Sequence, residues 1–293
     1  MPDMTRGTSD ELRALALKHL PPQDAERWLS LLRPAACLEK ATGSDPVVGQ
    51  LGGTPRLPAG TDWPVWEGHG PLSFVASVDC AGLAVGALDI ALDIALPSDG
   101  TLLFFSFDGQ VDDGEALVLP DDPETRPGAR VLFVPAGEAT EERTAPEGLP
   151  PYPRVPLTAR VRVTAPDPSH PLIQRTFGPD ARFGRAHPVV AEEFLDALWA
   201  LRDGTGHQIG GHADPVQNPV ELEVAHALLG GRVAWDDPRL LAEANRLLPL
   251  AQIDSDGDAG MLWGDVGTLY WLIRPEDLAE RRFDEAVFTW QCG

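Results

Sequence analysis

Four aspartates in the segment DSDGDAGMLWGD have the spacing of a calcium-binding loop. Carboxylates at positions one, three, five and twelve of such a loop surround one Ca²⁺ ion, and here these positions hold Asp254, Asp256, Asp258 and Asp265. Two features oppose calcium binding: Ala259 stands at position six, where the sharp turn requires glycine, and position twelve lacks the bidentate glutamate. We therefore interpret the segment as an acidic β-turn and expect no metal or cofactor, with calcium bound by these four residues as the weaker alternative.

Two histidines, His207 and His212, flank the sequence QIGG. A glycine pair lets a ligand approach the backbone closely, and an imidazole beside a carboxylate can transfer protons. The spacing of the histidines matches neither a helical metal pair nor a nucleophile dyad. The chain also has no GxSxG element, no Walker loop and no dinucleotide fingerprint. His207 is therefore a candidate ligand-binding residue without an assigned reaction.

Tryptophans near these segments could line a pocket. Trp63 lies in GTDWPVWEG, and Trp263 lies within the acidic segment, two residues before Asp265. A Trp-Pro turn also packs well onto a core with its indole N–H bonded to a carbonyl, which is the simpler interpretation of Trp63. We assign no catalytic residue. The residues expected to contact a ligand are Trp63, His207, Gln217, Asp254, Asp256, Trp263 and Asp265.

The charge of the chain limits its partners. Its 293 residues include 45 acidic and 23 basic side chains, for a formal net charge of −22. Such a field repels phosphate backbones and anionic lipid surfaces. We therefore expect a protein or a small ligand as the partner, and neither nucleic acid nor a membrane.

Cysteine usage and the N-terminal segment indicate a cytoplasmic protein. The three cysteines, Cys37, Cys80 and Cys292, are far apart in the sequence and form no CxxC pair, which is typical of free thiols in a reducing compartment. The first twenty residues mix acids and arginines and lack the apolar stretch of a signal peptide.

The periodicity of apolar residues predicts an α+β protein rich in strands. Residues 9–33 have helical spacing, broken by a proline pair, and indicate an N-terminal helical cap over 1–45 ahead of a domain over 46–293. The expected strands are 73–79, 101–107, 116–120, 129–135, 157–164, 248–254, 267–273 and 286–292. The expected later helices are 188–203, 218–231, 236–248 and 275–283.

The two halves of the domain contain matching fragments in the same order. Leu51-Gly52-Gly53, FVASVD and GTLLFF in the first half correspond to Ile209-Gly210-Gly211, PLAQID and GTLYWL in the second. This internal repeat predicts two pseudo-equivalent β lobes, about 46–165 and 205–293, with helices inserted into the second.

An ordered set of motifs identifies a family resemblance. VVGQLGGTPRLPAGTDWP, PLSFVASVD, DGTLLFFSF, HQIGG, LPLAQIDSD and the segment from Trp263 to Cys292 resemble the YwqG-like proteins, over roughly residues 46–292. The resemblance implies a mostly bacterial family of domains of unknown function, with no assigned activity and no catalytic residues to carry over.

From these features we expect a non-enzymatic binding or protein-interaction role, with the ligand in the cleft between the two β lobes. One form of this role is an immunity or inhibitor protein whose acidic surface neutralises a basic partner. The alternative is a metal-assisted, hydrolase-like enzyme that uses the loop from Asp254 to Asp265.

Overall fold

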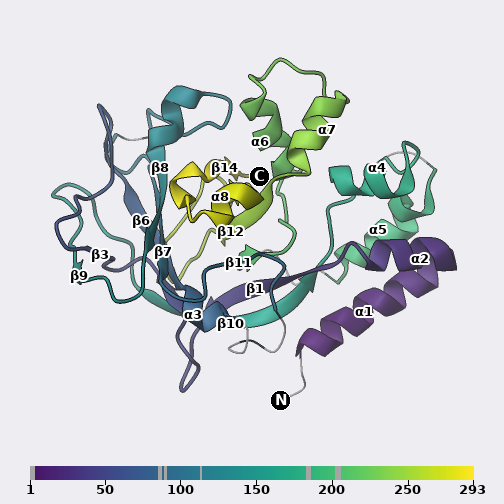
Figure 1. Cartoon of the computed structure of the whole chain (residues 1–293), viewed down its shortest axis with the longest axis horizontal. Coiled ribbons are helices and arrows are strands. Elements are labelled where there is room, and N and C mark those ends of the chain that lie inside the picture. Colours follow the sequence, from purple (N-terminus) through teal and green to yellow (C-terminus); the bar gives the residue numbers. More distant parts are fainter. Residues whose placement is uncertain (1–3, 85–87, 89–90, 113, 183–185, 202–205) are drawn as a thin grey trace.

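The computed structural model (Figure 1) is an α+β protein built around one large antiparallel sheet. It describes residues 4–84, 88, 91–112, 114–182, 186–201 and 206–293. Within these residues the strand order of the large sheet is β14-β13-β12-β11-β1-β10-β2-β6-β7-β8. The mixed, strand-rich fold class expected from the sequence is confirmed.

The bounds of the strands in this sheet are β1 Arg33–Lys40, β2 Gly49–Leu51, β6 Ser73–Asp79, β7 Thr101–Ser106, β8 Ala129–Val134, β10 Val155–Thr164, β11 His207–Gly210, β12 Leu248–Asp254, β13 Thr268–Ile273 and β14 Val287–Gln291. Four short strands form two small ribbons, in which β3 (Arg56–Pro58) pairs with β9 (Thr140–Glu142) and β4 (Val65–Trp66) pairs with β5 (Gly70–Pro71).

The strand order is symmetric about the central pair, β1 and β10. Each central strand pairs with one short strand on its outer side, β1 with β11 and β10 with β2. The matching Leu51-Gly52-Gly53 and Ile209-Gly210-Gly211 fragments end β2 and β11, and the other matching fragments form β6 and β12, then β7 and β13. Two copies of one β unit would give this order. The two halves are thus the wings of one continuous sheet.

The sheet curves so strongly that its two wings share one hydrophobic core (Figure 1). The ring of Phe104 on β7 lies 5.1 Å from that of Trp271 on β13, and Trp271 also contacts Phe288 on β14. Strand β13 is buried on both faces, as its sequence indicates, because alternate residues such as Tyr270 pack under helices on the outer face. We call the face opposite the main core the outer face.

Two groups of helices cover parts of the outer face. Helices α1, α2, α4 and α5 share a second apolar cluster with the end of β10, and α6 and α7 share a third with β13. None of the described helices combines the length and apolar content that crossing a lipid bilayer requires. The helix bounds are α1 Met4–His19, α2 Pro22–Leu29, α3 Cys80–Leu83, α4 Pro171–Phe177, α5 Glu192–Trp199, α6 Val220–Leu228, α7 Pro238–Ala244 and α8 Pro275–Ala279.

Three segments differ from the sequence-based expectation. The segment 1–45 is helical only through Leu29 and then supplies β1, whose Arg-Pro-Ala-Ala start carries no strand signal. The strand expected at 116–120 is wrong, because the N–H of Leu119 bonds the hydroxyl of Thr125 instead of a neighbouring strand. The helix expected at 188–203 is a 3₁₀ turn followed by α5, and positions 202 and 203 lie outside the described residues.

Candidate functional site

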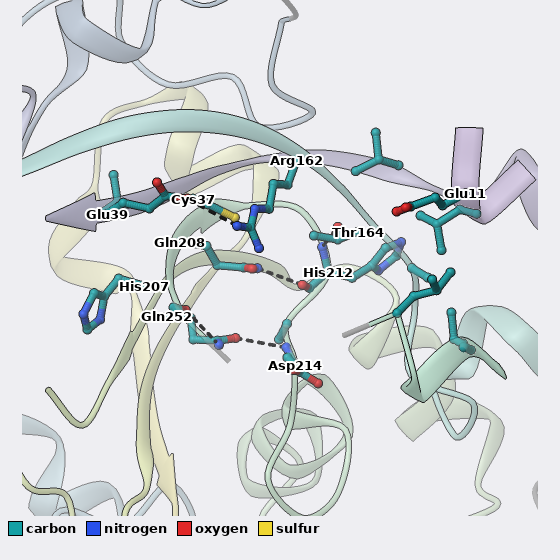
Figure 2. A pocket seen from close by; sticks show the side chains of 18 residues that line it. Glu11, Cys37, Glu39, Arg162, Thr164, His207, Gln208, His212, Asp214 and Gln252 are labelled. Atoms are coloured by element: carbon teal, nitrogen blue, oxygen red, sulfur yellow. Dashed lines mark hydrogen bonds and ion pairs between the residues drawn. The ribbon is translucent and has the colours of Figure 1, made fainter. Parts of the chain in front are cut away.

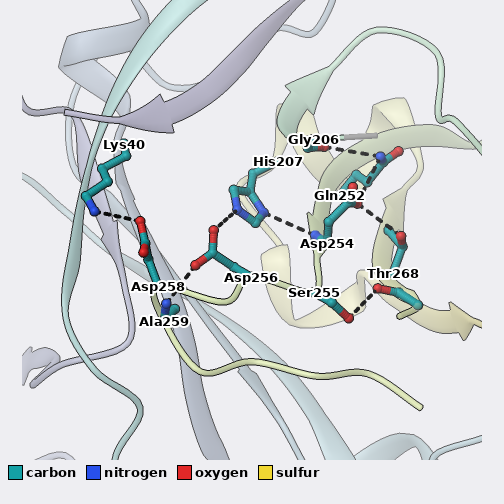
Figure 3. A network of polar contacts seen from close by, with 11 residues as sticks. Lys40, Gly206, His207, Gln252, Asp254, Ser255, Asp256, Asp258, Ala259 and Thr268 are labelled. Carbon is teal, nitrogen blue, oxygen red and sulfur yellow. Dashed lines mark hydrogen bonds and ion pairs between the residues drawn. The ribbon is translucent and has the colours of Figure 1, made fainter. Parts of the chain in front are cut away.

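His207, the first residue of β11, lies against the acidic loop that follows β12 (Figure 3). Its Nε2 is 3.4 Å from Oδ2 of Asp256, and its Nδ1 accepts the backbone N–H of Asp254 at 3.1 Å. The residue is 8% exposed. The structure therefore brings together three of the residues that the sequence predicts as ligand contacts.

Both ring nitrogens of His207 are engaged. Because a backbone N–H can only donate, Nδ1 must be the acceptor. Nε2 therefore carries the ring N–H and donates a hydrogen bond to Asp256. This hydrogen bond, with help from the N–H of Ala259, holds the pKa of Asp256 below its ordinary value. A general base needs a free lone pair within reach of the substrate proton. His207 has none, and the pair fixes the loop against β11.

The four aspartates of the calcium-like spacing turn to different partners. Oδ1 of Asp254 accepts the hydroxyl of Thr268 at 3.0 Å, and Asp258 lies 2.6 Å from the ammonium of Lys40. Asp265 is exposed on the turn before β13. Among the described residues, no group of three or more His, Cys, Asp or Glu side chains is placed to hold a metal ion. The arrangement is that of an acidic turn with internal hydrogen bonds.

A cavity of about 270 Å³ lies between the outer face of the sheet and helices α1 and α5 (Figure 2). Its floor includes Cys37 of β1, Gln208 of β11 and Gln252 of β12, which stand opposite one another in the register of three adjacent strands. Leu12 of α1 and Leu198 of α5 line the helical side. The cavity thus lies beside the central strands, where the two wings of the sheet meet.

The polar side chains of the cavity floor are held in fixed positions. Nε2 of Gln208 donates to the carbonyls of Gly210 and His212, at 3.1 and 2.8 Å. Oε1 of Gln252 accepts the N–H of Asp214 at 2.9 Å. The two glutamines are only 7% and 1% exposed. Since burying a carboxamide is unfavourable without such bonds, the network keeps a polar floor in place.

Charged groups of both signs stand at the cavity. The guanidinium of Arg162 lies 3.3 Å from the carboxylate of Glu39, which also receives a hydrogen bond from Arg160 at 3.0 Å. Glu11 of α1 adds a carboxylate from the opposite side. The cavity therefore offers hydrogen-bond donors and acceptors to a polar ligand.

A buried polar cluster supports the cavity wall at His212. Nε2 of His212 donates to the carbonyl of Leu31 at 2.7 Å, and its ring centroid is 5.6 Å from that of His170. Burial and the neighbouring His170 lower the pKa of His212 to about 3. Nε2 of His170 lies 3.4 Å from Glu221, which is 3% exposed. Burial alone would raise the pKa of Glu221, but His170 outweighs burial and the pKa is lowered.

The remaining predicted ligand contacts lie elsewhere. The indole of Trp63 donates to the carbonyl of Leu72 at 2.8 Å, as expected for a Trp-Pro turn. Trp263 is 4% exposed in the main core. The amide of Gln217 donates to the carbonyl of Cys292 at 2.8 Å. The described lining of the cavity includes His207 but none of these three residues.

Sequence reasoning missed most of the cavity. Cys37 lies in a strand that was not foreseen, and Arg162 has the alternating pattern of an ordinary surface strand. The available signal was Gln252, because it interrupts the apolar sequence LPLAQI of β12, and it lies opposite Gln208 in β11, where every residue is buried. A buried amide in such a strand indicates either a hydrogen-bond network or a ligand.

The fold and the site define the class of this protein. It is an α+β domain with one curved antiparallel sheet and a polar cavity on the outer face of that sheet. The chain belongs to the family described as Domain of unknown function (DUF1963), whose model matches residues 49–292. A search of curated proteins found no match. The family match agrees with the unassigned activity expected from the sequence, and the likeness to the YwqG-like proteins stays a resemblance.

Proposed function

We propose that this chain is a binding protein of the cytoplasm that holds a small polar ligand in the cavity between the sheet and helices α1 and α5. The observation that carries the proposal is the buried, hydrogen-bonded floor of Gln208 and Gln252. A fold stabilised by apolar packing alone has no need of two carboxamides on adjacent strands, whereas a polar ligand needs partners in fixed positions.

The size of the cavity favours a small molecule. Ligand pockets typically measure about 300–1,000 Å³, and a cavity of about 270 Å³ is near the lower end of that range. Its walls combine apolar side chains, such as Leu12 and Leu198, with a few polar groups, which is the usual composition of a small-molecule site.

The state of His207 favours binding over hydrolysis. A hydrolytic site would use this imidazole as a base, yet its Nδ1 already accepts the N–H of Asp254. The acidic loop also does not gather its carboxylates around one centre. The polar groups next to the cavity are therefore suited to recognition.

Alkylation of Cys37 tests this proposal. Cys37 lines the cavity and Cys292 lies outside its described lining, while both thiols are partly exposed. Burial raises the pKa of the third thiol, Cys80, to about 12, so it should not react in the folded protein. A fragment library is screened against the full chain, and mass spectrometry follows modification by iodoacetamide at each site.

We expect polar fragments that slow the modification of Cys37 at least several-fold and leave Cys292 unchanged. Protection should be lost in Ala165→Leu, which fills the cavity from a lining position, and kept in Ala139→Leu, which adds the same atoms at an exposed site. A library in which no fragment protects Cys37, or in which both thiols are always protected together, would contradict the proposal.

A further inference from the structure

The loop between β12 and β13, residues 255–267, is held rigidly by its own hydrogen bonds. Asp256 and Met261 exchange two backbone bonds of 2.9 and 2.8 Å, and the hydroxyl of Ser255 accepts the N–H of Trp263 at 2.9 Å. Met261 and Trp263 are 2% and 4% exposed and belong to the main core. The β12–β13 loop is thus fixed to the core at several points.

Two aliphatic side chains of this rigid loop face solvent. Leu262 is 65% and Val266 is 71% exposed, the largest values among the exposed large apolar residues that the structure describes. Val266 also has a φ of 51°, in the left-handed region that a β-branched residue rarely adopts. Glycine would adopt this φ without strain. Backbone strain of this kind is concentrated at functional sites, which makes the exposed Val266 a candidate contact residue.

Charge indicates what could cover these side chains. The β12–β13 loop contains Asp256, Asp258 and Asp265, in a chain with a formal net charge of −22. Asp256 bonds His207 and Asp258 pairs with Lys40, so the exposed Asp265, which lies between Leu262 and Val266 in the sequence, supplies the negative charge beside them. A second copy of the chain or an anionic lipid surface would be repelled. A surface that buries Leu262 and Val266 beside these carboxylates must therefore be apolar at its centre and basic at its rim.

We propose that the β12–β13 loop is a docking surface for a basic protein, and that Leu262 and Val266 enter an apolar pocket of that protein bordered by Lys and Arg. This surface is distinct from the cavity under α1 and α5, and the proposal does not depend on a ligand there. The rigid loop would lose little conformational entropy on binding, so its two apolar side chains would act as preformed anchors.

Site-specific photo-crosslinking tests the proposal. p-Benzoylphenylalanine replaces Leu262 in one variant of the full chain. In the control variant it replaces Val65, which is 49% exposed on the small ribbon of β4 and β5. Both proteins are irradiated in the cells that produce the chain, and adducts are identified by mass spectrometry. The adduct partner is then purified, and its affinity is measured for the wild type, Leu262→Ala, Val266→Gly and Val65→Ala.

We expect an adduct specific to position 262 whose partner has a high isoelectric point. Leu262→Ala should weaken binding about tenfold or more, and Val65→Ala should leave it unchanged. Val266→Gly should weaken binding while raising the midpoint of urea unfolding, a combination that simple loss of folding cannot produce. Binding should also weaken as salt rises. No adduct specific to position 262, or a partner whose affinity is unchanged by Leu262→Ala and Val266→Gly, would overturn the proposal.

Discussion

The imidazole of His207 donates from Nε2 to the carboxylate of Asp256 across 3.4 Å, and this contact joins β11 to the loop after β12. We predict that Asp256→Asn lowers the free energy of unfolding by about 1 kcal/mol at neutral pH, since it removes the charge from this hydrogen bond. Asp258→Asn is the control, because Asp258 and its partner Lys40 are both more than half exposed, and loss of a surface ion pair should have little effect.

The same pair gives a pH dependence with a defined sign. The pKa of folded Asp256 lies below its ordinary value of 3.8, so its contribution is complete above that pH and disappears as the pH falls through the folded value. The difference in urea unfolding between the wild type and Asp256→Asn should therefore be largest at about pH 6 and should shrink as the pH falls below 3.8. A difference that stays constant over this range would show that the carboxylate charge has no part in the contact.

The buried pair of His170 and Glu221 should contribute more to stability. Glu221→Gln removes a charge that is 3% exposed and leaves His170 without its ionised partner. Loss of one member of a buried pair costs roughly 3 kcal/mol, and chemical denaturation would measure it. Glu193→Gln, at an exposed position of α5, should change the free energy by less than about 0.5 kcal/mol. Equal effects of the two substitutions would contradict this assignment.

Position 211 requires glycine for two reasons: its φ is positive, and neighbouring atoms leave no room for a side chain. A Cβ at this position would lie 2.5 Å from Cβ of Ala35 and 2.8 Å from Oγ1 of Thr164. At Gly230, which also has a positive φ, a Cβ would meet nothing within 4 Å. We predict a cost of about 1 kcal/mol for Gly230→Ala from strain alone, and at least about 2 kcal/mol for Gly211→Ala from strain and overpacking. Similar melting temperatures for the two variants would refute the steric role.

Val266→Gly should stabilise the free protein. The left-handed φ of 51° costs a valine roughly 1–2 kcal/mol, and the added freedom of glycine in the unfolded chain cancels about half of the gain. Urea denaturation should show a net increase of roughly 0.5–1 kcal/mol. Val47→Gly, at an exposed valine that is not among the positive-φ residues, should lower stability. A loss in both variants would exclude strain at Val266.

The elements with strong periodicity could be predicted from the sequence. The continuous apolar run in GTLYWLI indicates a strand buried on both faces, and β13 is such a strand. Capping by Asp237 ahead of Pro238 likewise marks the start of α7. The strand order could also be inferred in part, since the matching fragments end in equivalent places on either side of β1 and β10.

The cavity could not be predicted because it depends on contacts between distant segments. Cys37 and Gln208 become neighbours only through the pairing of β1 with β11, and β1 has a composition that does not signal a strand. His207 and Asp256 are 49 positions apart, and only the folded chain shows which acid reaches the ring. The spacing of the four aspartates does not fix the direction in which each carboxylate points, so their partners could not be read from the sequence.

The most direct test of ligand binding in the cavity is an amide NMR titration with a fragment that protects Cys37. If the cavity holds the ligand, the largest shifts should come from residues of its wall, Thr164, Gln208 and Ala213, and they should be absent in Ala165→Leu. Shifts that persist in Ala165→Leu, or that cluster on the β12–β13 loop and leave the cavity wall unchanged, would contradict the proposed function.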